Sequence, residues 1–397
     1  MAAHPPAEAA QAAPRSTRSA QPKHGAKERG LFAWCMSRQL ELSGAFLLVT
    51  LALNAVTPPE SHLSTALTPS PSYHLRSRIS RFLFLSFRKP GTDLYFKGRD
   101  DAFFITWWVG AFWFLREAFM RGVFGPFARW TGIKQRRAIV RFEEQAWACL
   151  YATVSFGIGL YINQTSDYRS LNTLHFWKGY PHDALPAFTK YYYLVQTAFW
   201  IQQIIVLNLE ARRKDYYQMF AHHIITVILM MFSYVLNWTR IGNTILCTMD
   251  LADVFLTLAK LFKYTGKEMA SDATFAVFLV TWIATRHVIF GRILWSVVTE
   301  PQTVLEYAWR SRDGYYFSHN VQRSFTLLLA ALQAIFCMWL FMILRVLWRM
   351  VQKGQVEDVR SDDEDDGEEE EEEEEEEAEP ATNGHANGVN LERKKDR

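Results

Sequence analysis

The chain has 397 residues and a formal net charge of +2, with 49% hydrophobic and 15% aromatic residues. The near-neutral charge averages two opposite parts, since eighteen of the 41 acidic residues but only one of the 43 basic residues lie between Glu357 and Glu379. The rest of the chain is therefore strongly basic, which fits nucleic acid, anionic lipid or an anionic substrate. We expect no nucleic acid partner because none of the usual binding motifs is present. The four widely spaced cysteines have no spacing typical of a disulfide framework or a zinc site.

The first 37 residues are rich in Ala, Pro and Arg and lack the pattern of a removable signal peptide, so the first apolar helix is expected to target the chain. Eight apolar segments follow that are long enough to cross a bilayer, which takes about 20 residues. They begin near residues 38, 101, 146, 191, 219, 243, 273 and 325. Aromatic residues gather at their ends, as is typical of membrane interfaces. The sequence predicts an all-α polytopic membrane protein with about eight transmembrane helices.

The distribution of basic residues predicts that both termini are cytosolic, because most basic loops then fall on one face. The loop 57–100 on the opposite face is also basic, and its segment from Ser80 to Phe87 has the pattern of an amphipathic interfacial helix. An interfacial first segment in place of a true span would move the N-terminus to the other side. The sequon Asn163-Gln164-Thr165 falls on the lumenal face, where glycosylation is feasible. A second sequon at Asn237 is expected to lie too close to the bilayer.

The chain divides into four regions. Residues 1–37 are a disordered basic N-terminus, residues 38–140 hold two flanking transmembrane helices, and residues 141–350 hold six more. Residues 351–397 form an acidic tail whose ten consecutive glutamates, Glu368 to Glu377, repel one another and predict disorder. The tail carries a candidate site for an acid-directed kinase at Ser361. Its last four residues, Lys394-Lys395-Asp396-Arg397, resemble the dilysine signal of endoplasmic-reticulum membrane proteins.

Two adjacent histidines, His222 and His223, enter the fifth apolar segment. Ionisable residues inside a membrane are costly and usually face a cavity or a partner, which favours a functional role over a structural hydrogen bond. Thr226, Ser233 and Asn237 follow His222 at helical spacing, so these four residues share one helix face. This polar face predicts a wet or reactive interior.

The sixth segment has a similar polar face. It carries Asp250, Asp253, Thr257, Lys260 and Tyr264, separated by three, four, three and four residues. A carboxylate that accepts an imidazole N–H would fix its tautomer and raise its basicity. The alternative is a structural pair with Lys or Arg. At about 1.5 Å per residue, the aspartates lie deeper than the histidines in aligned helices, so either a helix is tilted or the aspartates orient a second substrate.

These residues resemble the longevity-assurance motif of ceramide synthases, within the wider class of TLC-domain membrane proteins, and the absence of a homeobox-like insert favours the fungal or plant type. The resemblance covers residues 140 to 350 at lower density. It implies six helices around a lipid-accepting tunnel, and transfer of a fatty acyl group from acyl-CoA to the amine of a sphingoid base. It also implies an influence of residues 294–324 on acyl length and, as partners, a small single-span subunit and a homo- or heterodimer. The matching positions are His222-His223, Thr226, Ser233-Tyr234, Asn237, Arg240, Gly242, Asp250, Asp253 and Ala259-Lys260.

The chemistry of this reaction suits the predicted residues. The catalytic candidates are His222, His223, Asp250 and Asp253, with an imidazole acting either as the base that deprotonates the amine or as a nucleophile that carries the acyl group. The candidates for substrate binding are Thr226, Ser233, Tyr234, Asn237, Arg240, Lys260, Arg212, Arg213 and Lys214. The last three would meet CoA phosphates, unless they serve only the orientation of the chain. No metal or cofactor is predicted, and acyl-CoA is a substrate.

Three other interpretations compete with this one. A fatty-acid elongase resembles His-x-x-His-His, but the outer position here is Met219. A di-iron desaturase would need several histidine boxes, whereas only His287 adds an imidazole in a span. A non-enzymatic TLC-domain lipid sensor or scaffold would have kept the fold without the chemistry, which the retained histidines and aspartates argue against.

Overall fold

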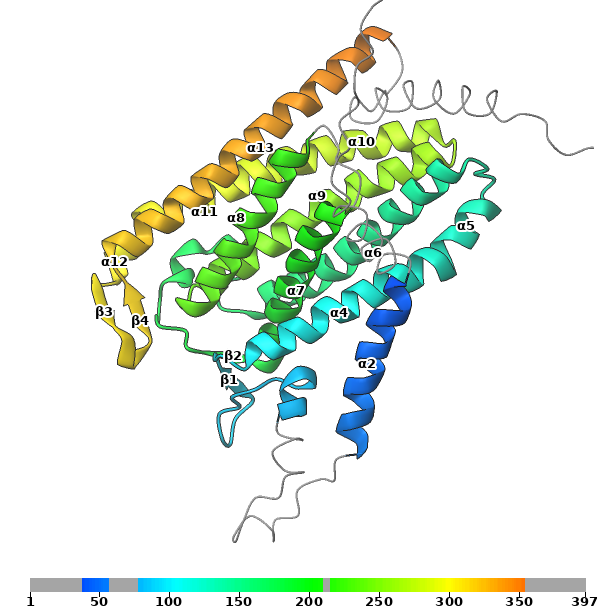
Figure 1. Cartoon of the computed structure of the whole chain (residues 1–397). Helices are drawn as coiled ribbons and strands as arrows, with labels where there is room; N and C mark the ends of the chain where they lie inside the picture. Colours follow the sequence, from blue (N-terminus) through cyan, green and yellow to red (C-terminus); the bar gives the residue numbers. More distant parts are fainter. Residues whose placement is uncertain (1–37, 57–77, 210–214, 354–397) are drawn as a thin grey trace, which may run out of the picture.

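The computed structural model describes residues 38–56, 78–209 and 215–353, and it is an array of long helices with small two-stranded sheets at one end (Figure 1). The predictions for residues 1–37, for the acidic tail beyond residue 353 and for Arg212, Arg213 and Lys214 fall outside these ranges. The long helices are α2 (Gln39–Val56), α4 (Asp101–Phe119), α6 (Arg136–Thr165), α7 (Ala187–Leu209), α8 (Tyr216–Val235), α9 (Thr239–Tyr264), α10 (Glu268–Ile283) and α13 (His319–Lys353).

Shorter helical elements extend two of these helices. A π-helical turn, η2 (Met120–Phe124), joins α4 to α5 (Gly125–Trp130), and a second one, η5 (Ala284–Ile289), joins α10 to α11 (Phe290–Thr299). A further turn of helix, α12 (Pro301–Val304), follows α11, and 3-10 turns occupy Arg169–Leu171, Thr173–Phe176 and Ser311–Asp313. Each π turn places one extra residue in the helix and so changes the direction of the side chains around it.

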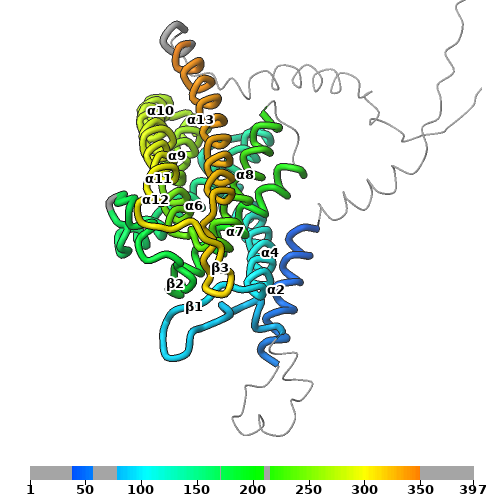
Figure 2. Tube along the Cα trace, turned by 90° about the vertical axis from the view of Figure 1, so that its left-hand side faces the viewer, coloured from blue at the N-terminus to red at the C-terminus, as the bar shows by residue number. Residues whose placement is uncertain are grey.

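Five helical stretches of the described chain are long and apolar enough to cross a membrane. They are Gln39–Val56, Arg136–Thr165, Tyr216–Val235, Glu268–Thr299 and His319–Trp348. The other long helices, α4, α7 and α9, lie among them in both views (Figures 1 and 2). The all-α membrane fold is thus confirmed, while the count of eight spans and a closed barrel stay predictions. Six helices begin three to ten residues earlier than predicted, at Arg136, Ala187, Tyr216, Thr239, Glu268 and His319.

Two small antiparallel sheets lie at one end of the array, the end predicted to be lumenal (Figure 1). Strand β1 (Leu94–Phe96) pairs with β2 (Ala184–Pro186), and β3 (Ala308–Arg310) pairs with β4 (Tyr315–Phe317). The pairing of β1 with β2 holds the segment before α4 against the segment before α7. The interfacial helix expected from Ser80 to Phe87 is shorter than predicted, since the helix ends at Leu83 and Phe87 has a positive φ of 64°.

A buried ion pair ties α4 to α7 beneath these sheets. Lys190 Nζ lies 2.7 Å from Asp101 Oδ1, with side chains 0% and 3% exposed. Lys190 also donates to the carbonyl oxygens of Ser86 and Phe96, and Tyr234 of α8 donates to Asp101 Oδ2 at 2.7 Å. Because an unpaired charge would be costly here, these contacts fix α4 against the six-helix region.

The first sequon lies in the last turn of α6, where its amide is already engaged. Asn163 Nδ2 donates to the Gly159 carbonyl at 2.9 Å, and Asn163 Oδ1 accepts from the Thr244 hydroxyl at 3.0 Å. Glycosylation needs an accessible loop, so the folded structure does not present this asparagine as an acceptor. The sequence could not indicate this because it does not show where α6 ends.

Close contact between helices depends on a glycine in α9. A methyl group at Gly242 would collide with the Tyr193 hydroxyl of α7 and lie 2.9 Å from Ser233 Oγ of α8. We therefore expect Gly242→Ala to destabilise the protein by about 1–3 kcal/mol, as overpacking does. Thermal unfolding in detergent measures this. Gly157→Ala is the matched control, because no atom lies within 4 Å of the added methyl, and a similar loss in both variants would contradict the prediction.

The Lys97 ammonium is enclosed at the same end of the array. Its Nζ donates to Asn237 Oδ1 at 2.7 Å and to the His182 carbonyl at 3.0 Å. Burial lowers the pKa of Lys97 to about 7, despite the opposing charge of Asp183. The side chain lies between β1 and α4, outside the membrane-spanning helices.

A depressed lysine pKa makes stability depend on pH. Between about pH 7 and pH 10.5 the unfolded chain binds more protons at Lys97 than the folded chain, so the free energy of unfolding should rise with pH across this window. Unfolding in detergent at several pH values measures the slope. Lys97→Met should flatten it, whereas Lys89→Met, at an exposed position, should not. Equal slopes in the wild type and Lys97→Met would refute the assignment.

Candidate active site

A cavity of about 310 Å³ lies within the six-helix region. Its wall is mostly apolar, with a few polar groups, as is usual for sites that bind small molecules. It is lined from α6, α7, α8, α9, α13 and the stretch from α10 to α11. The polar lining residues are Tyr151, Tyr193, Gln203, His222, His223, Thr226, Ser233, Asp250, Asp253, Thr257 and Arg286.

Both predicted histidines line this cavity from the second turn of α8. His223 Nδ1 lies 2.5 Å from the Met219 carbonyl oxygen. A carbonyl only accepts, so Nδ1 carries the proton, and Nε2 of a neutral His223 has a free lone pair. The Trp200 ring lies 5.7 Å and 5.4 Å from the rings of His222 and His223, which limits their movement. His222 Nδ1 is buried and has no hydrogen-bond partner in the described chain.

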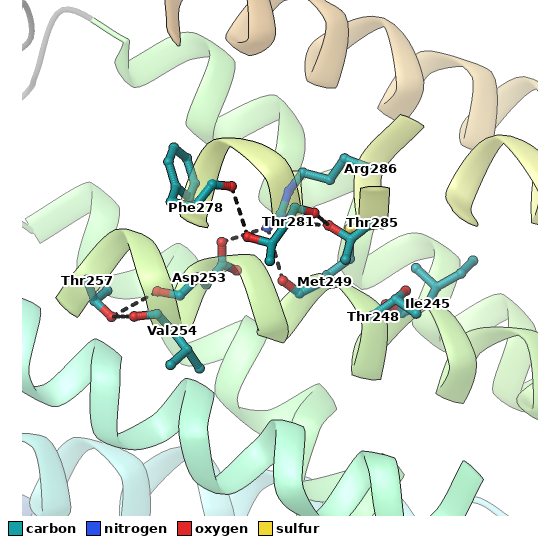
Figure 3. A network of polar contacts seen from close by, with 10 residues as sticks. All are labelled: Ile245, Thr248, Met249, Asp253, Val254, Thr257, Phe278, Thr281, Thr285 and Arg286. Carbon is teal, nitrogen blue, oxygen red and sulfur yellow. Dashed lines mark hydrogen bonds and ion pairs between the residues drawn. The ribbon is translucent and has the colours of Figure 1, made fainter. Parts of the chain in front are cut away.

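Asp253 of α9 faces Arg286 of the π turn η5 (Figure 3). The Arg286 guanidinium donates to Asp253 Oδ1 at 2.6 Å and to the Met249 carbonyl at 3.2 Å. It also lies over the Trp282 ring, 4.2 Å from the centroid. The Asp-to-Arg pair was the structural alternative to a catalytic role, and it is present, although both residues also line the cavity.

Asp250, one helical turn earlier, is held by neutral donors. Ser155 of α6 donates to Asp250 Oδ2 at 2.5 Å, and Gln196 of α7 donates to the same oxygen at 3.3 Å. Gln196 also contacts Ser155, and it donates to Tyr192 at 2.9 Å. The two aspartates therefore differ: Asp253 has a cationic partner, and Asp250 accepts from uncharged groups of two other helices.

The expected hydrogen bond between a carboxylate and an imidazole is not formed in the described chain. Asp253 accepts from Arg286, Asp250 accepts from Ser155 and Gln196, and His223 uses a carbonyl of its own helix. The difference in depth between the two helices explains this separation. The histidines and aspartates nevertheless face one cavity, which leaves the second hypothesis, that the aspartates orient a substrate.

The predicted substrate-binding residues divide into two groups. Thr226 and Ser233 line the cavity with the histidines. Four others lie elsewhere. Asn237 and Arg240 follow the end of α8 at Val235, where the positive φ of Asn237 turns the chain, whereas Tyr234 lies within α8 and Lys260 near the end of α9. Tyr234 donates to Asp101, Asn237 binds Lys97 and the Gly314 carbonyl, Arg240 donates to the His175 carbonyl, and Lys260 lines a second cavity.

Several residues of the site were missed in the sequence. Gln196 and Ser155 donate to Asp250 without lining the cavity, and they belong to no recognisable pattern. The signal for Arg286 was an arginine inside an apolar run, next to His287. The sequence does not reveal the π turn in which Arg286 lies, and so its partner was not identified.

This arrangement defines a membrane-embedded site of the TLC class: residues 141–345 match the TLC domain, and the chain belongs to that family. Among its relatives, the sphingosine N-acyltransferase lag1 of Schizosaccharomyces pombe is 40% identical over 296 residues, 74% of this chain and 75% of the relative. The ceramide synthase LAG1 of Saccharomyces cerevisiae is 38% identical over 288 residues, 72% and 70% of the two chains. The ceramide synthase hyl-1 of Caenorhabditis elegans is 32% identical over 218 residues, 54% and 59% of the two chains.

The enclosed Asp253–Arg286 pair should couple the two residues energetically. In a double-mutant cycle of Asp253→Asn and Arg286→Gln, we expect a coupling of about 1–2 kcal/mol, since each single change leaves a polar group without its partner. Unfolding in detergent provides the four stabilities. Arg292 and Glu300 are the control at the same 2.6 Å. Arg292 is 49% exposed, against 5% for Arg286, whereas the carboxylate of Glu300 is 16% exposed and that of Asp253, which faces the cavity, is 37% exposed. Additive effects at Asp253 and Arg286 would contradict the expectation.

Proposed function

We propose that the protein is a ceramide synthase, which transfers a long or very-long fatty acyl group from acyl-CoA to the amine of a sphingoid base. The observation that carries this proposal is the pair His222 and His223 inside an apolar cavity of a TLC domain. The printed names of the relatives, sphingosine N-acyltransferase and ceramide synthase, support the same reaction.

The cavity suits one apolar chain and one reacting end. Its apolar wall, including Leu229, Leu256 and Leu332, suits hydrocarbon, whereas CoA is large and anionic and must stay outside. His222 lies six residues after the start of α8, roughly 9 Å along the helix axis. We place the thioester near this end of α8, at the mouth of the cavity on the face predicted to be cytosolic.

The reaction forms an amide bond and breaks a thioester. The amine nitrogen attacks the carbonyl carbon, the C–S bond breaks, and the proton lost by nitrogen is transferred to the leaving CoA thiolate. The free Nε2 of His223 suits either of two roles: it accepts and returns that proton, or it first takes the acyl group as an acyl-imidazole that the amine then cleaves. Both routes balance without a cofactor.

The aspartates suit the other substrate. A sphingoid base carries an ammonium group at neutral pH, and a carboxylate in a low-dielectric wall attracts it strongly. Asp250 accepts from neutral donors in the described chain, so no ion pair with a cation competes there with the ammonium, while Arg286 offsets the charge of Asp253. We propose that these two residues position the amine.

The elongase alternative receives no support from the geometry. At the position where an elongase motif has its outer histidine, Met219 stands, and it contributes a backbone carbonyl to His223. The competing function is that of a TLC-domain sensor or scaffold that catalyses no reaction. An assay of ceramide formation distinguishes it from the enzyme.

The protein is a multi-pass membrane protein, and we propose the endoplasmic reticulum as its location, with both termini in the cytosol. The support is the C-terminal Lys394-Lys395 and the basic face. A small single-span subunit and a dimer remain proposals that rest on family resemblance.

Membranes that contain the wild type, His222→Ala, His223→Ala or Asp253→Asn are incubated with labelled acyl-CoA and a sphingoid base, and ceramide is measured. Loss of the acting imidazole should lower the rate by about 100-fold or more. His287→Ala is the control, because His287 is an imidazole of the same bundle that contacts Gln333 and lies outside the cavity lining.

Full activity in every variant would overturn the catalytic assignment, and no ceramide from the wild type would favour the scaffold. Labelled acyl-CoA supplied without amine separates the two routes. A hydroxylamine-labile acyl group on the protein, lost in the histidine variants, indicates the acyl-imidazole.

A further inference from the structure

A second cavity of about 170 Å³ lies between α9, α10 and α13. Most of its wall is apolar, and Trp282 and Leu256 line both this cavity and the candidate active site. In Figure 1 the start of α10 and the end of α13 both lie at the end of the bundle opposite the small sheets, and the two helices diverge toward that end. The apolar lining consists of Leu256, Ala259, Phe275, Phe278, Trp282, Phe341, Met342, Ile343 and Val346.

Three basic side chains line the same cavity: Lys260, Lys263 and Arg345. Lys263 and Arg345 are exposed, and neither forms an ion pair with any residue for which the structure gives a position. Lys263 is one residue from the end of α9, so the charges lie at the face predicted to be cytosolic. Orientation of the chain accounts for basic residues at a helix end, but not for their gathering around an apolar hollow.

We propose that this cavity binds a phosphate-bearing membrane lipid, with its headgroup at Lys263 and Arg345 and an acyl chain against Phe275, Phe278 and Ile343. Basic pockets between transmembrane helices on the cytosolic side bind anionic headgroups in this way. A soluble anion would gain nothing from the apolar wall, and a neutral lipid would gain nothing from the cations. The site is distinct from the histidine cavity and does not depend on the proposed reaction.

The lining connects this lipid to the other cavity. Trp282 forms the shared wall, and its ring lies under the Arg286 guanidinium, which holds Asp253. A lipid chain that packs against Trp282 would therefore restrict the ring that supports the Asp253–Arg286 pair. Occupancy of the lipid site would in this way steady the wall of the candidate active site.

The test uses the purified full-length protein in detergent micelles, titrated with labelled phosphatidic acid, and measures the lipid retained after gel filtration. The double variant Lys263→Gln/Arg345→Gln should bind about 30-fold more weakly, since each basic residue near a membrane surface contributes about fivefold. Ile343→Trp, which fills the hollow and keeps the charges, should also lower binding. The matched control is Lys267→Gln/Arg323→Gln, which removes two exposed charges outside the cavity.

Preferential binding of phosphatidic acid that both cavity variants weaken and the control keeps would support the site. Equal binding of phosphatidylcholine with the same chains, or equal competition by glycerol phosphate, would overturn it. Displacement by acyl-CoA would identify a substrate site instead. If phosphatidic acid did not bind the full-length chain, the proposal would also be refuted. Such a result is the one expected if the acidic tail of the chain, and not a lipid, occupied the cavity. Each readout is independent of ceramide formation, so its failure is distinct from failure of the proposed reaction.

Discussion

The polar interior of the helix bundle depends on the ion pair between Asp253 and Arg286. A carboxylate and a guanidinium inside an apolar helix bundle are each costly, and they are stable there because they neutralise one another at 2.6 Å. The pair needs Arg286 to point at α9, and this residue belongs to the π turn between α10 and α11. This part of the polar wall thus depends on α9 and on the π turn between α10 and α11 together, and not on the aspartate alone.

Charged side chains are also paired at the opposite end of the bundle. Asp101, Lys190 and Tyr234 join α4, α7 and α8, and Lys97 adds a contact to Asn237 just beyond α8. Tyr234 also stacks on Tyr193, whose hydroxyl contacts Ser233 in the cavity wall. The helix that precedes the TLC domain is therefore connected to the cavity wall through a short series of side chains.

Local periodicity was enough to predict the helical segments and the polar faces of α8 and α9. The periodicity predicted that five side chains face a shared interior, and all five line the same cavity: His222, Thr226, Ser233, Asp250 and Asp253. It failed where a helix ends, because a face continues only as far as the helix does, and Asn237 lies beyond that point. Partners contributed by other helices, such as Gln196 for Asp250, depend on packing that a single sequence does not contain.

Trp282 lines both cavities of the helix bundle. Its indole separates the hollow that contains the histidines from the one rimmed by lysine and arginine, so neither volume is independent of the position of this ring. Leu256 is the other residue that lines both spaces, and a smaller residue in place of Trp282 would leave this leucine at the boundary beside the guanidinium of Arg286. The extent of each space is therefore set, at this boundary, by one aromatic and one aliphatic side chain.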